Sequence, residues 1–185
     1  MTAVVAAARP ALVIVPGNFS LPRFWSAIQR LVEDKGYAVE VIPLQSSREV
    51  RIDPAPGLAD DVKEAQSLLN KHINQGKDVI MLMHSYGGMV RTEATRGLGR
   101  IKREKAGLKA TIFTPPGKNT RGLYQTNPGR YPRRKGEGLP PAQGIFKISQ
   151  ASRVFGDEQT YNGFHGLIPS SYTLTKKDVT VPEAA

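Results

Sequence analysis

The chain has no cysteine and only three histidines among its 185 residues. The absence of cysteine excludes disulfide bonds, thiolate zinc sites and cysteine nucleophiles. The histidines, His72, His84 and His165, are scattered without the close spacing that metal ligands require. We therefore expect no metal and no other cofactor. A chain without cysteine also fits a reducing compartment, so we expect a cytoplasmic protein.

Long apolar runs are missing as well. Hydrophobic residues make up 39% of the chain, which is enough for a globular core, but no apolar run approaches the ~18 residues that span a bilayer. The first basic residue is Arg9, so the N-terminus lacks the charged region of a secretory signal. We expect no membrane span, and we interpret the first residues as part of the mature protein.

Acidic residues are scarce in one segment. Between Arg91 and Lys135 lie thirteen Lys or Arg and two acids, a net charge of +11, while the whole chain carries +10. Tyr124 and Tyr131 lie among these charges, a composition that can suit nucleic acid. The charges follow no helical face and match no known nucleic-acid module, so we expect no nucleic-acid partner. An anionic substrate or a membrane surface stays open as the role of this segment.

The first half of the chain alternates apolar runs with helical patterns. Buried strands are predicted at Ala11–Val15, Tyr37–Leu44 and Asp78–Met83. Helices are predicted at about residues 22–36, at Leu58–Ile73 and from just after Ser85 to about Thr95, with Gly36 and Gly76 as stop signals. This order predicts an α/β fold with a doubly wound, mostly parallel sheet.

The second half is less regular. Lys109–Thr114 and Ser171–Thr175 are short strand candidates, whereas Lys118–Gly144 is rich in Gly, Pro and Arg and has no clear period. The chain length favours one domain. We expect a single domain of residues 1–185, in which residues 118–167 form an irregular or partly disordered cap region.

The stretch MLMHSYGGMV, Met81–Val90, ends a predicted strand on a serine. A strand, a sharp turn on Ser85 and a helix that starts at once are typical of a nucleophile elbow. Strand and helix approach closely there, so small residues are needed two positions before and after the serine. Gly87 and Gly88 meet this need on the helix side, and Met83 does not meet it on the strand side. A simple turn between strand and helix is the alternative interpretation.

At these residues the chain resembles the α/β-hydrolase fold, close to small fungal and bacterial hydrolases of the AB hydrolase-1 type. Plant methyl esterases and hydroxynitrile lyases are more distantly similar. VIVPGNF stands where the family has an apolar strand followed by H-G-x-x, and DVIMLMHSYGGMV where it has a strand, G-H-S-x-G-G and a helix. TEATRGLGRIKREKAGLKATIFTPPG resembles the family's helix, basic spacer, strand and Pro-Gly turn, and IPSSYTLTKKDVTVP resembles the strand that delivers the acid of the triad. The resemblance covers about residues 10–117 and 168–182.

The resemblance implies a role for four residues. Ser85 would be the nucleophile, and the backbone N–H groups of Tyr86 and Asn18 would form the oxyanion hole. Asp178 would orient the catalytic base. His84, although adjacent to the nucleophile, is interpreted as a packing residue. Asn18 as an ordinary turn residue and Asp178 as a solvated turn acid are the alternatives.

The chain departs from the family pattern at the histidine that serves as the catalytic base. The family places the triad histidine beyond a further helix and strand after the acid. Only seven residues, VTVPEAA, follow Asp178, so the chain lacks the C-terminal strand and helix, as a truncated hydrolase or a degenerate relative would. His165 is the only candidate substitute, and we interpret it as a surface or cap histidine. His72 is expected at the surface.

The sequence therefore predicts a serine hydrolase of small esters or lactones that is impaired by the missing histidine. The alternative is a non-catalytic α/β-hydrolase-like protein that binds a ligand in the same pocket. Whether the chain is an active enzyme, which substrate it takes and its oligomeric state are left open at this stage.

Overall fold

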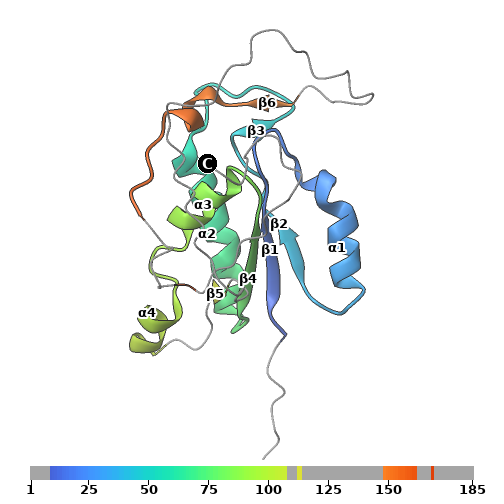
Figure 1. The fold of residues 1–185 in the computed structure, drawn as a ribbon, viewed down its shortest axis with the longest axis vertical. Coiled ribbons are helices and arrows are strands. Elements are labelled where there is room, and N and C mark those ends of the chain that lie inside the picture. The colour runs from blue at the N-terminus through green and yellow to red at the C-terminus, as the bar shows by residue number, and fades with distance from the viewer. Residues whose placement is uncertain (1–8, 108–111, 114–147, 162–167, 169–185) are drawn as a thin grey trace, which may run out of the picture.

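A computed structural model describes residues 9–107, 112–113, 148–161 and 168 (Figure 1). Its centre is a sheet of four parallel strands in the order β2-β1-β4-β5. The strands are β1 (Ala11–Val15), β2 (Val39–Val41), β4 (Val79–Met83) and β5 (Ile112–Phe113). β1 pairs with β4 along its whole length, so the loops that follow these two strands leave from the same edge of the sheet.

Helices cover both faces of this sheet, as Figure 1 shows, with α1 on one side and α2 and α3 on the other. They are η1 (Pro22–Trp25), α1 (Ser26–Glu33), α2 (Leu58–Asn74), α3 (Gly87–Ala94) and α4 (Arg100–Lys105). The predicted doubly wound, mostly parallel α/β architecture is confirmed.

The alternation of side chains along β1 explains why the sheet needs two layers of helices. Val13 and Val15 pack in one apolar cluster with residues of α2 and α3. Ile14 points to the opposite face, where Trp25 and Val32 pack against it. Because the strand is apolar on both faces, each face must be covered to remove it from water.

Helix α2 carries the apolar stripe that the sequence predicts. Ala65, Leu69 and Ile73 are buried at a spacing of four residues. Asp60 caps its first turn by accepting the N–H of Gly57 at 2.8 Å. The helix ends just before Gly76, whose φ of +73° suits glycine.

A segment far along the chain returns to the carboxyl edge of the sheet. We call residues 148–161 the strap. It begins with β6 (Ser149–Gln150), which pairs antiparallel with β3 (Ser47–Arg48), and continues into η2 (Ser152–Phe155). Its Val154 is buried in the cluster between the sheet and α2 and α3.

The strap is fastened at two further points. Asp157 accepts the N–H of Leu58 at 2.6 Å, at the start of α2. Glu93 of α3 accepts the backbone N–H groups of Thr160 and Tyr161. Residues that are distant in sequence thus hold α2, α3 and the β3–β6 pair together.

The other sequence predictions about the fold concern the strand at Tyr37–Leu44, the second half of the chain and the absence of a membrane span. The strand expected at Tyr37–Leu44 is shorter, and a further short strand, β3, follows it. Residues 118–144 and Ser171–Thr175 lie outside the described residues, and the single-domain organisation stays a prediction. Within the described part of the chain, no helix is both long and apolar enough to cross a bilayer.

Candidate active site

Ser85 occupies a sharp corner between strand and helix. Its φ is +52°, in the left-handed region that non-glycine residues rarely adopt. β4 ends at Met83, and His84 still donates its N–H to the carbonyl of Val15 at 3.1 Å. The N–H of Gly87 closes the turn on the carbonyl of His84 at 2.9 Å, and α3 begins there. The predicted sharp turn is present, and Ser85 is exposed at its tip.

Gly87 provides the close approach that this turn needs. A β-carbon added at Gly87 would lie 2.3 Å from the carbonyl oxygen of Val15 and 2.6 Å from that of Pro16. Gly88 has no such neighbour within 4 Å, so only the first of the two predicted glycines is required by packing. Met83, which departs from the small-residue pattern, is half-buried and packs against the core cluster on the α2 and α3 side.

The loop after β1 runs directly against the serine turn. A β-carbon at Gly17 would lie 2.6 Å from His84 Nδ1 and 3.0 Å from Ser85 Cβ. This contact places Asn18, the next residue, beside the nucleophile candidate. The structure thus brings Asn18 and Ser85 together although 66 residues separate them in the sequence.

The backbone N–H groups of Asn18 and Tyr86 lie near Ser85. Among the described residues, neither the N–H of Asn18 nor that of Tyr86 has a hydrogen-bond acceptor. The side-chain Oδ1 of Asn18 is also buried without a partner in this part of the chain. Free N–H groups beside an exposed hydroxyl are the groups that a developing oxyanion requires.

The ring of His84 contacts an aromatic side chain of η1. Its ring packs edge-on against Trp25, with 6.1 Å between the ring centroids and an interplanar angle of 60°. Trp25 belongs to η1 on the α1 side of the sheet. His84 is nevertheless exposed, so its role as a packing residue stays a prediction.

Tyr86 is anchored by a buried carboxylate that the sequence did not reveal. Its hydroxyl donates to Asp61 Oδ2 at 2.8 Å. Burial and the neighbouring Asp61 carboxylate raise the pKa of the Tyr86 phenol, so it stays protonated. Asp61 is an acid in the first turn of α2, where the helix dipole favours negative charge, and it is fully buried. Its spacing of four residues from Ala65, on the apolar face of α2, is the signal that could have indicated burial.

The serine turn and the Asn18 loop lie where the chain reverses its direction of winding. From β1 the chain passes through α1 to β2, and from β2 it passes through α2 on the other face to β4. The loops after β1 and β4 therefore diverge to opposite faces at the carboxyl edge. Ligands of open α/β sheets bind at such a point.

The other predicted residues are not part of this cluster. Asp178 and His165 lie outside the described residues. The prediction of a surface position for His72 is wrong, because His72 is 3% exposed and its Nε2 lies 2.9 Å from Glu40 Oε1. The described residues contain no group of three or more His, Cys, Asp or Glu that could hold a metal ion.

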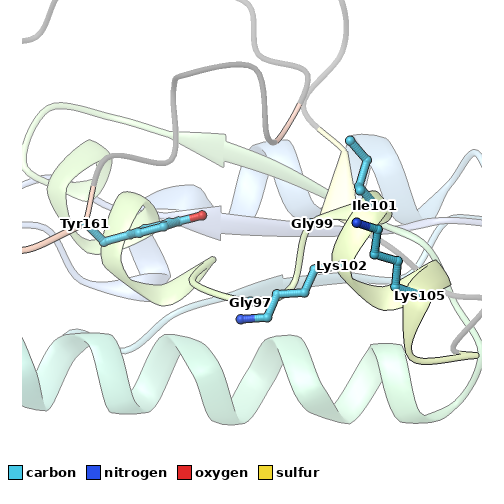
Figure 2. Close-up of a pocket in the computed structure, with 6 residues that line it drawn as sticks. All are labelled: Gly97, Gly99, Ile101, Lys102, Lys105 and Tyr161. Atoms are coloured by element: carbon cyan, nitrogen blue, oxygen red, sulfur yellow. The ribbon is translucent and has the colours of Figure 1, made fainter.

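Two hollows lie on the described part of the surface. One, of about 350 Å³, follows the Asn18 loop and is lined mainly by apolar side chains, including Leu21, Pro22, Leu44, Val50 and Ile52. The other, of about 190 Å³, lies at α4 and is shown in Figure 2. There Tyr161 reaches from the end of the strap toward the turn at Gly97 and Gly99, and Lys102 and Lys105 come from α4.

The described part of the segment 91–135 contains both buried and exposed basic residues. Arg91 and Arg103 are buried. Arg96 pairs with Glu93 at 2.8 Å, and Arg100 lies 3.9 Å from Glu104. Lys102 and Lys105, both on α4, are exposed.

Comparison with known proteins places these features in a family. The family model described as Alpha/beta hydrolase family matches residues 12–179. A protein of Aspergillus novofumigatus named Alpha/beta hydrolase nvfD is 33% identical over 95 residues, which are 50% of this chain and 36% of the relative. A Phoma protein named "Probable hydrolase R7" is 24% identical over 105 residues, 57% of this chain and 41% of the relative.

Among solved structures, a mutant of polyneuridine aldehyde esterase is similar at 19% identity with a TM-score of 0.39. The match covers 59% of this chain and 42% of the esterase chain. The matched part of the chain therefore spans less than half the length of each of these relatives.

Proposed function

Because the chain belongs to the alpha/beta hydrolase family, we propose that it is a serine hydrolase of small esters or lactones in which Ser85 is the nucleophile. The observation that carries this proposal is the exposed serine at φ +52°, with the unoccupied N–H groups of Asn18 and Tyr86 beside it. A buried structural turn would not need a strained, solvent-facing serine next to free donors.

In the proposed reaction, Ser85 Oγ attacks the carbonyl carbon of the substrate. Negative charge then develops on the carbonyl oxygen, and the N–H groups of Asn18 and Tyr86 stabilise it. One such donor contributes about 10²–10³-fold in rate in serine hydrolases. The ester bond breaks as the tetrahedral intermediate collapses, the alcohol leaves with a proton, and water then releases the acid from Ser85.

The catalytic base is the unassigned part of this mechanism. We propose that Asp178 orients a histidine, as the family resemblance implies. Neither described histidine suits this role, because His72 is buried beside Glu40 and His84 packs against Trp25. We therefore propose that the chain acylates slowly. Without a working base the remaining acceleration is on the order of 10³-fold over water.

The apolar hollow after the Asn18 loop supports the proposed substrate class. Leu21 lies three residues beyond Asn18, and Leu44 and Val50 line the same hollow. We propose that this hollow, whose lining also includes Ser47, Arg48 and Glu49, takes the hydrocarbon group of a small ester or lactone. Such a neutral substrate also needs no nucleic-acid or metal partner.

The proposal is tested by reaction with p-nitrophenyl butyrate and with a fluorophosphonate probe. Both should acylate or phosphonylate the wild-type chain slowly, and Ser85→Ala should abolish the reaction. Added imidazole should raise the acylation rate in proportion to its concentration, because it supplies a general base. A rate that is equal in wild type and Ser85→Ala would refute the proposal.

A ligand-binding protein without catalysis is the second candidate, and the positions of His72 and His84 favour it. It predicts that no probe labels Ser85, even with imidazole. Small acyl ligands would nevertheless raise the melting temperature of the protein, since they bind the folded state.

A further inference from the structure

We propose that Gln150 and Asp61 are positioning residues. They hold the two donors of the oxyanion hole, Asn18 N–H and Tyr86 N–H, in fixed positions relative to each other. This inference rests on the proposed function and adds to it two residues that the sequence did not indicate. The structure joins them in one chain of hydrogen bonds between the two sides of the site.

One end of this hydrogen-bond network is the loop that carries Asn18. The next residue, Phe19, has a φ of +57°, which is strained for a residue with a β-carbon. Its N–H donates to Gln150 Oε1 at 3.0 Å. The same oxygen accepts the hydroxyl of Ser47. Gln150 thereby holds Phe19 in its strained conformation and fixes the Asn18–Phe19 peptide, which is adjacent to the Gly17–Asn18 peptide that carries the Asn18 N–H.

The other end of the hydrogen-bond network is Tyr86. Its hydroxyl donates to Asp61 Oδ2, which also accepts the hydroxyl of Ser46 at 2.5 Å. The other carboxylate oxygen accepts the N–H of Ser46 at 3.0 Å. Three donors on a fully buried carboxylate offset the cost of burying its charge.

Ser46 connects the two ends. The amide Nε2 of Gln150 donates to Ser46 Oγ at 2.7 Å, and that hydroxyl in turn donates to Asp61. Hydrogen bonds therefore run without a break from Phe19 through Gln150, Ser46 and Asp61 to Tyr86. The part from Ser46 to Tyr86 is buried, Gln150 is half-buried and Phe19 is exposed. Connected hydrogen bonds of this kind hold their members in one arrangement.

Fixing both donors matters because an oxyanion hole acts only when its N–H groups already point at the charge that develops. A shift of about 1 Å in a positioning group can cost on the order of 100-fold in rate. Loss of Gln150 should release the Asn18 side of the hole and weaken the hold on the Tyr86 side through Ser46, so we expect a loss of about 10-fold.

The test measures acylation of the full chain by p-nitrophenyl butyrate with imidazole present. Gln150→Leu should lower the acylation rate constant about 10-fold and leave the substrate dissociation constant unchanged. Gln159→Leu is the matched control, since Gln159 lies on the same strap and donates to the carbonyl of Met89. It should keep the wild-type rate constant.

Two further variants separate positioning from simple stability. Gln150→Glu has the shape and donor of glutamine only when protonated, so its rate relative to wild type should fall as the pH rises from about 5 to about 8. Tyr86→Phe keeps both backbone N–H groups and breaks the network at the other end. Its effect and that of Gln150→Leu should be less than additive, because both interrupt the same chain.

A Gln150→Leu variant with the wild-type rate constant would overturn the inference and leave the proposed function intact. The same holds if Gln159→Leu loses as much rate as Gln150→Leu, or if Gln150→Glu shows no dependence on pH relative to wild type. Absence of any Ser85-dependent reaction in the wild-type chain would overturn the proposed function, and this inference with it.

Discussion

Gly87 lies against the carbonyl oxygen of Val15 so closely that a β-carbon at position 87 would be 2.3 Å from that oxygen. The two residues belong to different elements, the start of α3 and the end of β1. Their contact sets how near the helix comes to the sheet, and the strained turn at Ser85 depends on that distance.

This contact predicts opposite outcomes for the two adjacent glycines. Gly87→Ala should lower the free energy of unfolding by on the order of 3 kcal/mol, because the backbone oxygens it meets cannot move aside. Gly88→Ala has open space in a helix and should be neutral or raise stability by up to about 1 kcal/mol. Urea unfolding of both variants measures the difference, and equal effects would contradict the close approach.

The positive φ of Ser85 predicts that Ser85→Gly is more stable than wild type although it cannot react with the probe. Ser85→Gly should raise the free energy of unfolding by about 0.5–1 kcal/mol, since glycine adopts this conformation without steric cost. Ser85→Ala removes the hydroxyl but keeps the β-carbon, so it should show no such gain. Thermal unfolding compares the two, and neither variant should react with the fluorophosphonate probe.

The buried His72 predicts a loss of stability in mild acid. Burial lowers the pKa of its imidazole below 6.5, and nearby Glu40 only partly opposes this. The unfolded chain therefore binds a proton at a higher pH than the folded chain does. Stability is complete above about pH 6.5 and should fall as the pH drops below that value.

His72→Gln should flatten this dependence. The measurement is the urea midpoint at about pH 7.5 and about pH 5.5 for wild type and variant. An equal drop in both proteins would show that another group causes it.

Glu93 predicts a second, more acidic transition that affects the strap. Burial opposes its ionisation, but hydrogen bonds from Arg96 and from the N–H groups of Tyr161 and Thr160 outweigh burial and lower the pKa of its carboxyl. Its contribution is present above about pH 4.5 and is lost as the pH falls through the lowered pKa. Glu93→Gln should weaken the strap at neutral pH by about 1–3 kcal/mol.

Limited proteolysis within residues 156–161 measures this effect. Cleavage should be faster in Glu93→Gln than in wild type at neutral pH, and faster in wild type at acid pH than at neutral pH. Glu158→Gln, an exposed acid on the same strap, is the control and should cleave at the wild-type rate.

Much of the fold could be predicted because its signals are local. The apolar run of β1, the stripe of Ala65, Leu69 and Ile73, and the glycine after Ser85 each depend on spacing within a few residues. These signals also predicted the serine turn. The prediction for His72 is wrong and the burial of Asp61 was not foreseen, because both are polar residues on the buried side of α2 and residue type outweighed their position on the helix.

The sequence by itself determined the alternation of strands and helices, and with it a serine at the end of a central strand, because backbone geometry and apolar periodicity act over short distances. Only the tertiary structure decided what surrounds that serine. Phe19 and Gln150 are 131 residues apart, and no local pattern records their hydrogen bond. Their contact follows from the pairing of β3 with β6, which forms only when the strap folds back over the edge of the sheet.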